Sequence, residues 1–368
     1  PFCDRPARIR FTGSVRVVAE GTPIFPHAPI LEVEAPVAEA QLIETLLINQ
    51  ITISTILASK AIRIVEAARG APVIDFGTRR AHGFDAGNKA ARSAYIAGCT
   101  GTANVLAGKL YGLPIAGTMA HSYVEAWKDE LSAFRAFTAL YPDTVLLIDT
   151  YDAIQGADNV IALARELGDD FRVRAVRLDS GDLAELSKEV RRRFDEAGLQ
   201  GVQIIASGGL DEHRIADLAA AAAPIDGYGV GTRLTTSSDA AELDIAYKLA
   251  AYGGEGRMKL APLRKNLPGA KQVCRIEADG VARNDVIRRL GEDGPGRPLL
   301  ETVMADGVRT EAGRRSLDEI RATAVREVAR LPAHLRAIEP ARPAYAVEVS
   351  DELRRYTETI EAELRAHA

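Results

Sequence analysis

The 368-residue sequence contains few cysteines, no long apolar run and no excess of basic charge. Its three cysteines, Cys3, Cys99 and Cys274, are far apart, without CxxC spacing or a matching pattern of histidines. This argues against a disulfide framework or a structural zinc site and favours a reducing compartment. A formal net charge of -5 provides no basic field for a polyanion, so we expect no nucleic acid partner.

No segment reaches the roughly 20 uninterrupted apolar residues of a membrane span. The first residues, PFCDRPARIR, lack the apolar core of a signal peptide. We therefore expect a cytoplasmic protein without a membrane partner. The sequence begins with Pro1 instead of methionine, and we expect that a further segment precedes it.

An apolar content of 47% is enough to fill two domains, or one barrel with additions. Residues 8–36 contain short alternating runs, SVRVV and ILEVEAP, between glycines and prolines, which predict a small β element. Residues 37–69 predict one or two helices whose high apolar content indicates buried packing. Further along we expect a strand and turn at KQVCRIEADG and helices over residues 317–331 and 351–368.

The middle of the chain alternates between short apolar runs and helical stretches. The runs end in small or charged residues and read PVIDFG, LPIAGT, TVLLIDTYD, VRAVRLDSGD, VQIIASGG and DGYGVGT. Strands that are buried on both faces and alternate with helices indicate a parallel sheet. Because no GxGxxG follows the first run, the pattern favours an α/β barrel over a dinucleotide-binding sheet.

In α/β barrels the active site lies at the carboxyl ends of the strands, and every predicted strand ends in reactive residue types. In chain order these candidates are Asp75, Arg79, Arg80 and His82; His121 and Ser122; Asp149, Tyr151 and Asp152; Arg177, Asp179, Ser180 and Asp182; Ser207, Gly208 and Gly209; and Gly229, Gly231, Thr232 and Arg233.

Two glycine-rich turns predict a phosphate site. SGG at residues 207–209 and GVGTR at residues 229–233 carry hydroxyl groups and lead towards helix N-termini. Free backbone N–H groups and the helix dipole bind a phosphate dianion at such places, commonly after the last two strands of a barrel. The alternative is that these glycines only turn strands into helices, but their occurrence on consecutive units favours the phosphate site.

The motif RLDSGD predicts a site for sugar hydroxyls. Asp179 can accept hydrogen bonds from vicinal hydroxyl groups while Asp182 caps the next helix or faces Mg²⁺. Arg177 points to the same side of the strand as Asp179. It therefore either pairs with that aspartate or binds a substrate carboxylate, and the spacing leaves both possibilities open.

The motifs GTRRAHG and GTMAHS supply cations and a histidine. Arg79 and Arg80 suit pyrophosphate or a second anion, although arginine pairs also occur on solvated surfaces. His121 is either a reactive group or a polar residue that begins a helix, with Ser122 as the cap. Together the candidates predict chemistry on a phosphorylated sugar.

Six ordered motifs resemble the nicotinate phosphoribosyltransferase family: DFGTRRAHG, TGTANVLAGKLYGLPIAGTMAHS, VRLDSGDL, IIASGGLDE, GYGVGTRL and LPGAKQV. The resemblance covers nearly the whole chain. It implies an irregular or incomplete α/β barrel joined to a smaller mixed α+β domain formed from the two chain ends. Residues 1–36 would be the N-terminal β element of the smaller domain, residues 37–252 the barrel, and residues 253–368 the remainder of the smaller domain.

The resemblance also implies the reaction. Members of this family join nicotinate to 5-phosphoribosyl 1-diphosphate, release diphosphate and form nicotinate mononucleotide for NAD biosynthesis. The expected cofactors are Mg²⁺ and ATP, because the family couples the reaction to ATP hydrolysis through a phosphorylated histidine. We expect a homodimer with the active site near the subunit interface.

Carried onto matching positions, the resemblance places the phosphorylated histidine at His121, with Ser122 beside it. Arg177 would hold the nicotinate carboxylate, and Asp179, followed by Ser180, would hold the ribose hydroxyls. The remaining expected contacts are Ser207, Gly208, Gly209, Gly231 and Thr232 with the 5-phosphate, and Arg79 and Arg80 with the base or the diphosphate. The motifs do not specify the Mg²⁺ ligands.

Two further features concern the base. Family members carry an aromatic residue, in a segment before the one seen here, that stacks on the pyridine ring across the dimer. Ala103 stands where relatives that use nicotinamide have an aspartate. An amide would benefit from that acceptor and a carboxylate would be repelled by it, so Ala103 favours nicotinate.

Three alternatives remain. A nicotinamide or quinolinate phosphoribosyltransferase would share the fold and the phosphate loops. A phosphosugar aldolase or isomerase would need a Schiff-base lysine or a carboxylate pair, and the predicted strand ends contain no lysine. A non-enzymatic binding module would not need so many charged groups on one face of the barrel.

Overall fold

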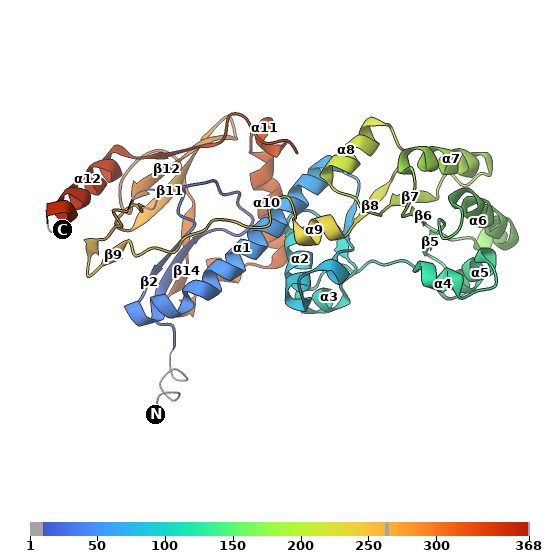
Figure 1. Ribbon diagram of the computed structural model, residues 1–368, viewed down its shortest axis with the longest axis horizontal. Helices are drawn as coiled ribbons and strands as arrows, with labels where there is room; N and C mark the ends of the chain where they lie inside the picture. Colours follow the sequence, from blue (N-terminus) through green and yellow to red (C-terminus); the bar gives the residue numbers. More distant parts are fainter. Residues whose placement is uncertain (1–9, 262–264, 367–368) are drawn as a thin grey trace, which may run out of the picture. The chain divides into compact units, whose positions relative to one another are not determined.

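The computed structural model describes residues 10–261 and 265–366 (Figure 1). The chain divides into two compact units, a barrel unit of residues 53–242 and a two-end unit of residues 10–52 together with the described part of 243–368. The chain therefore passes from one unit to the other after residues 52 and 242, whereas the sequence predicted boundaries after residues 36 and 252. Cys3 is outside the described residues, whereas Cys99 and Cys274 are buried and form no disulfide in the described part of the chain.

The barrel unit contains a six-stranded sheet in the order β4-β3-β8-β7-β6-β5. All neighbouring strands are parallel. The strands are β3 (Val73–Asp75), β4 (Gly101–Thr102), β5 (Val145–Leu147), β6 (Ala175–Leu178), β7 (Gln203–Ala206) and β8 (Gly227–Val230). Leu146, Val176 and Ile204 are fully buried on neighbouring strands of this sheet. Since β4 and β5 are its two edges, the sheet is an open half-barrel, which confirms the predicted incomplete α/β barrel.

Helices follow the strands of the barrel unit. They are α2 (Phe84–Ile96), α3 (Val105–Tyr111), α4 (His121–Glu125), α5 (Glu130–Leu140), α6 (Ala153–Leu167), α7 (Leu183–Glu196), α8 (Glu212–Ala220) and α9 (Thr232–Thr236). Helix α6 packs against both α5 and α7 (Figure 1). Aspartate side chains accept first-turn N–H groups and so fix where α5, α6, α7 and α8 begin; these caps are Asp129, Asp152, Asp182 and Asp211.

One predicted strand is not a strand in the structure. The run LPIAGT at residues 113–118 contributes only an isolated bridge between Ile115 and Thr102. The sixth strand is instead β4, which is two residues long. Pro114 has no N–H with which to extend a β-ladder. Its carbonyl accepts a hydrogen bond from the N–H of Thr102 at 3.0 Å.

The two-end unit contains two four-stranded sheets. The first has the order β15-β14-β1-β2, formed by β15 (Val308–Arg309), β14 (Leu300–Ala305), β1 (Ser14–Val18) and β2 (Leu31–Glu34). The second has the order β13-β11-β12-β16, formed by β13 (Arg297–Pro298), β11 (Lys271–Ala278), β12 (Val281–Arg289) and β16 (Ala346–Val349). The antiparallel pairing of β1 with β14 joins the two ends of the chain, as expected.

A short hairpin and further helices also belong to the described part of the two-end unit. These elements are β9 (Ala251–Tyr252), β10 (Glu255–Gly256), α10 (Leu317–Ala329), α11 (Ala333–Arg336) and α12 (Asp351–Ala366). The strand expected at KQVCRIEADG is β11, and the two helices expected in the C-terminal region are α10 and α12.

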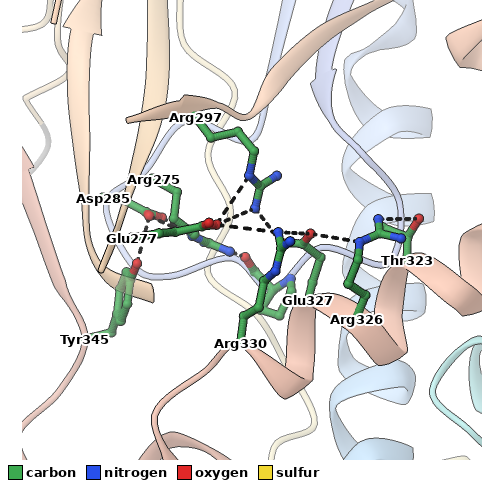
Figure 2. A network of polar contacts seen from close by, with 10 residues as sticks. Arg275, Glu277, Asp285, Arg297, Thr323, Arg326, Glu327, Arg330 and Tyr345 are labelled. Carbon is green, nitrogen blue, oxygen red and sulfur yellow. Dashed lines mark hydrogen bonds and ion pairs between the residues drawn. The ribbon is translucent and has the colours of Figure 1, made fainter. Parts of the chain in front are cut away.

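Ion pairs fasten α10 to the second sheet of the two-end unit (Figure 2). Arg297 on β13 lies 3.0 Å from Glu277 on β11 and 2.6 Å from Glu327 on α10. Deeper in the unit, Arg275 pairs with Asp285 at 2.9 Å, and both side chains are 1% exposed. Because the two buried charges compensate each other, this part of the sheet tolerates an ion pair in its core.

Helix α1 (Val37–Ala67) was expected to be buried packing, and this is wrong for its first half. Leu42 and Leu46 are 62% and 61% exposed, whereas Leu57 and Ile64 in the second half are buried. Among the described helices, α1 has the length and hydropathy of a membrane span, but a core helix passes the same test. The physical reason for the error is that helical apolarity indicates a contact surface without saying which part of the chain covers it.

Candidate active site

The loop after β3 is organised by a buried carboxyl group. Asp75 accepts hydrogen bonds from the N–H of Gly77 and the hydroxyl of Thr102, each at 2.8 Å. Burial raises the pKa of Asp75 above its ordinary value, and these two hydrogen bonds oppose that effect. Asp75 therefore holds the start of the GTRR loop against β4 and has no open face for a substrate.

Arg177 on β6 lies at the centre of a hydrogen-bonded cluster at the strand ends. Its guanidinium group donates to Asp179 at 2.9 Å, to the hydroxyl of Ser207 at 3.1 Å and to the carbonyl of Met119 at 3.2 Å. The hydroxyl of Ser207 also donates to Asp179. The structure thus shows the pairing of Arg177 with Asp179 that the sequence left as one of two possibilities.

The charge of Arg177 is influenced by its neighbours. Burial lowers its pKa below the ordinary arginine value, the carboxylates of Asp179 and Asp149 raise it, and the positive charge of Arg79 lowers it further. Arg79 therefore lies close enough to interact electrostatically with the cluster, and both Arg79 and Arg80 are exposed at the strand end. Two exposed cations at this strand end suit an anionic ligand.

Asp149, two residues after the end of β5, fixes the backbone of the RLDSGD loop. Its Oδ2 accepts hydrogen bonds from the N–H of Asp179 at 2.8 Å and from the hydroxyl of Ser180 at 2.6 Å. The sequence marks Asp149 as a strand-end candidate without a role, and the signal was its position as the first polar residue after an apolar run. The structure gives it the role of orienting Asp179.

His121 is the first residue of α4 and lies next to the cluster. Its Nε2 is 3.8 Å from Oδ2 of Asp179, and its Nδ1 is 3.2 Å from the hydroxyl of Thr150. The side chain of His121 is 40% exposed, so a dissolved substrate can reach it. Ser122 was expected to cap this helix, but the N-cap is Ala120, which provides no side-chain hydrogen bond.

The two glycine turns follow β7 and β8, which are neighbouring strands of the sheet. Gly208 and Gly209 have φ values of 87° and 65°, in the region that glycine occupies without strain. A Cβ atom on Gly208 would overlap the carbonyl group of Asp179, so the SGG turn rests directly on the RLDSGD loop. Gly231 is the N-cap of α9 and lies against Phe76 and Gly77 of the loop after β3.

The structure brings together most of the predicted site. Asp182 caps α7 through N–H groups of Ala184 and Glu185, as expected. Within the described residues the side chains of Arg80, Ser122 and Thr232 form no hydrogen bond to the cluster of His121, Asp149, Arg177, Asp179, Ser180 and Ser207.

A site for Mg²⁺ can be tested on the same carboxylates. The described residues contain no group of three side chains that could hold a metal ion. Mg²⁺ commonly keeps several waters and binds one or two carboxylates together with substrate phosphates. Asp182 fits this mode because both hydrogen bonds of its cap use Oδ1, which leaves Oδ2 for the ion. Asp179 fits because its Oδ2 faces only His121 among the described residues.

Parallel strands whose carboxyl ends carry the reactive groups define the class of α/β-barrel enzymes. Comparison with known proteins is more specific: residues 72–260 match the nicotinate phosphoribosyltransferase (NAPRTase) family. The chain belongs to this family.

The most similar relatives include bacterial and human proteins. The chain is 53% identical over 347 residues to nicotinate phosphoribosyltransferase pncB2 of Mycobacterium tuberculosis, covering 94% of this chain and 75% of that protein. It is 46% identical to nicotinate phosphoribosyltransferase of Bacillus subtilis, covering 70% of this chain and 54% of that protein. The crystal structure of human nicotinic acid phosphoribosyltransferase matches with a TM-score of 0.86 and 28% identity, over 98% of this chain and 84% of that one.

Proposed function

We propose that the protein is a nicotinate phosphoribosyltransferase, which joins nicotinate to 5-phosphoribosyl 1-diphosphate and releases diphosphate and nicotinate mononucleotide for NAD biosynthesis. The observation that carries this proposal is the cluster of Arg177, Asp179 and Ser207, hydrogen-bonded to one another at the strand ends beside His121. Membership of the family supports it.

In this proposal the reaction needs positioning more than acid or base catalysis. The pyridine nitrogen attacks the anomeric carbon of the ribose as the bond to diphosphate breaks, through a transition state with oxocarbenium character. The nitrogen is already a nucleophile, so no general base is required. Asp179, oriented by Asp149, would hold the ribose hydroxyls, and Ser180 would lie at the same edge.

The anionic groups of the substrates would be held by separate parts of the strand-end surface. The glycine turns, with Ser207, Gly208, Gly209, Gly231 and Thr232, would bind the 5-phosphate through N–H and hydroxyl groups. Arg79 and Arg80 would meet the base or the diphosphate. When bound, Mg²⁺ would neutralise charge on the diphosphate, and Asp179 or Asp182 would be its protein contact.

Arg177 would provide positive charge for the nicotinate carboxylate. Its Nη2 donates to Met119 among the described residues, which leaves the second N–H of that nitrogen for a ligand. Ala103, exposed at the end of β4, leaves no carboxylate at that position to repel nicotinate. Both features support nicotinate over nicotinamide as the base.

ATP coupling would run through His121. An imidazole nitrogen would attack the γ-phosphorus of ATP, the bond to ADP would break, and water would later release phosphate and restore the imidazole. The exposure of His121 and its contact with Asp179 support this role. Ser122 would lie beside the phosphorylated residue.

We also propose a cytoplasmic homodimer. An exposed apolar patch supports association. It consists of Val105, Leu106 and Leu110 on α3 and of Ile115, which packs beside that helix. Patches of this kind commonly mark protein interfaces. Sedimentation would test this proposal, with a dimer as the expected species and a monomer at assay concentration as the contrary result.

The decisive experiment supplies nicotinate, nicotinamide and quinolinate in parallel to the full-length protein with 5-phosphoribosyl 1-diphosphate, Mg²⁺ and ATP. We expect nicotinate mononucleotide from nicotinate and little product from the other two bases. Product from nicotinamide or quinolinate alone would assign the chain to a different base, and no product from any base would overturn the function.

A further inference from the structure

Lys60, in the second half of α1, is a buried cation held between two carboxylates of the barrel unit. Its side chain is 5% exposed, and its Nζ lies 2.9 Å from Oε1 of Glu212 and 2.9 Å from Oδ1 of Asp239. Glu212 is 1% exposed and Asp239 is 53% exposed. A buried lysine is costly unless its charge is paired, so the two acids account for its place in the core.

One acid lies on the helix that follows the SGG turn, and the other lies in the turn after the helix that follows GVGTR. Glu212 is the first residue of α8, shortly after the SGG turn at residues 207–209. Asp239 lies in the turn that ends α9, the short helix that begins at Thr232 directly after Gly231. Lys60, on α1, therefore contacts α8 through Glu212 and the turn that follows α9 through Asp239.

Hydrogen bonds connect Asp239 to the GVGTR turn through helix α9. The hydroxyl of Thr235 donates to the carbonyl of Gly231 at 2.8 Å, and the turn after the helix is closed by a bond from Ala240 N–H to the Ser237 carbonyl at 2.9 Å. Helix α9 spans only five residues. A movement of Asp239 would consequently move the GVGTR turn at the other end of the helix.

We propose that Lys60 is a positioning residue that sets the spacing between the SGG and GVGTR turns, and thereby the affinity for the 5-phosphate of the ribosyl substrate. This inference rests on the proposed function, because it assumes that both turns bind the same phosphate. A dianion held by N–H groups from two turns needs both turns at hydrogen-bonding distance together, since these bonds weaken steeply with misalignment.

Asp239 is the informative position to change. Removing Lys60 leaves Glu212 buried and unpaired, and removing Glu212 takes away the buried partner of Lys60, so both changes threaten folding. Asp239 is half-exposed, and its loss keeps the buried Lys60–Glu212 pair intact. We expect Asp239→Asn to raise the KM for 5-phosphoribosyl 1-diphosphate about fivefold, the effect of losing a partly exposed ion pair. The KM for nicotinate, kcat and the Tm should stay at wild-type values, and Asp239→Glu should retain low KM.

Asp217→Asn is the matched control. Asp217 is an exposed aspartate on α8, so the substitution removes the same charge from the helix that carries Glu212 and leaves both ion pairs of Lys60 in place. Its kinetics should equal those of the wild type. If Asp217→Asn raises the KM as much as Asp239→Asn, the effect is one of general charge, and the role of Lys60 is wrong.

Titration with inorganic phosphate gives a readout that does not depend on turnover. We expect phosphate to bind Asp239→Asn about fivefold more weakly than wild type. Equal phosphate affinity and equal KM in the wild type and Asp239→Asn would overturn the role of Lys60. A fall in Tm together with a rise in the KM for both substrates would also overturn it, because it would indicate a general loss of structure. If the wild type forms no mononucleotide, the proposed function fails, and the phosphate titration still decides whether Lys60 positions the two turns.

Discussion

Gly208 lies so close to Asp179 that a methyl group on its Cα would overlap the aspartate's carbonyl group. The middle residue of the turn proposed to bind phosphate and the residue proposed to hold the ribose therefore share one packed contact. Gly208 also has a φ of 87°, which L side chains rarely adopt. Both the backbone angle and the available space require glycine at this position.

Gly208→Ala should reduce kcat/KM for 5-phosphoribosyl 1-diphosphate by at least about tenfold, because the SGG turn must move away from the RLDSGD loop. Initial rates at varied ribosyl substrate would measure this, and a thermal melt would separate it from unfolding. Gly201→Ala is the matched control, since Gly201 has nothing within 4 Å of an added Cβ. Wild-type kinetics for Gly208→Ala would contradict the proposed packing requirement.

Asp149→Asn should lower kcat/KM about tenfold to a hundredfold, the effect of weakening hydrogen bonds to a charged acceptor. The reason is that Asp149 orients the backbone N–H of Asp179 and the hydroxyl of Ser180. Steady-state kinetics with both substrates would measure it. Asp143→Asn removes an exposed partner of Arg172 and serves as control; equal effects of the two substitutions would rule out a specific role for Asp149.

Incubation with γ-labelled ATP should label the wild-type protein with an acid-labile phosphoryl group, and His121→Ala should abolish the label. His121 is accessible and contacts Asp179, whereas His82, the other histidine at a predicted strand end, is an exposed residue of the bend after Arg80. His82→Ala is therefore the control and should label normally. Equal labelling of His121→Ala would remove the coupling role from this residue.

The strand-end residues could be predicted because the barrel rule depends only on the order of apolar runs and polar residues. Asp179 and Ser207 each follow such a run, Arg177 lies near the end of one, and the structure brings all three together. The contact between Asp149 and the N–H of Asp179 could not be predicted, because it joins loops of two neighbouring strands and leaves no local pattern.

The elements that were predicted wrongly have few local signals. Strand β4 is two residues long, too short for alternation to appear, while the apolar run at residues 113–118 imitates a strand. Ala120 precedes α4 without a capping side chain, so the hydroxyl of Ser122 suggested the wrong start. The exposed half of α1 has the composition of a buried helix, because composition does not reveal what covers a face.

Glu130, the first residue of α5, should make the stability of the protein depend on pH. Burial raises its pKa from an ordinary 4.5 to about 7, the hydrogen bond from Asn159 opposes this, and the charges of Asp149 and Asp152 add to it. The folded protein thus holds a proton that the unfolded chain releases near pH 4.5. The stability that this proton provides is complete below that pH and is lost as the pH rises to about 7, by up to about 3 kcal/mol.

Glu130→Gln keeps an uncharged side chain at every pH and should remove this loss. Denaturant unfolding between about pH 4 and pH 8 would measure it: the wild type should lose free energy of unfolding relative to Glu130→Gln as the pH rises. Glu125→Gln is the control, since Glu125 is exposed on α4, and its curve should run parallel to the wild type. A Glu130→Gln curve that also runs parallel to the wild type would mean that Glu130 titrates as an ordinary carboxyl group in the folded protein.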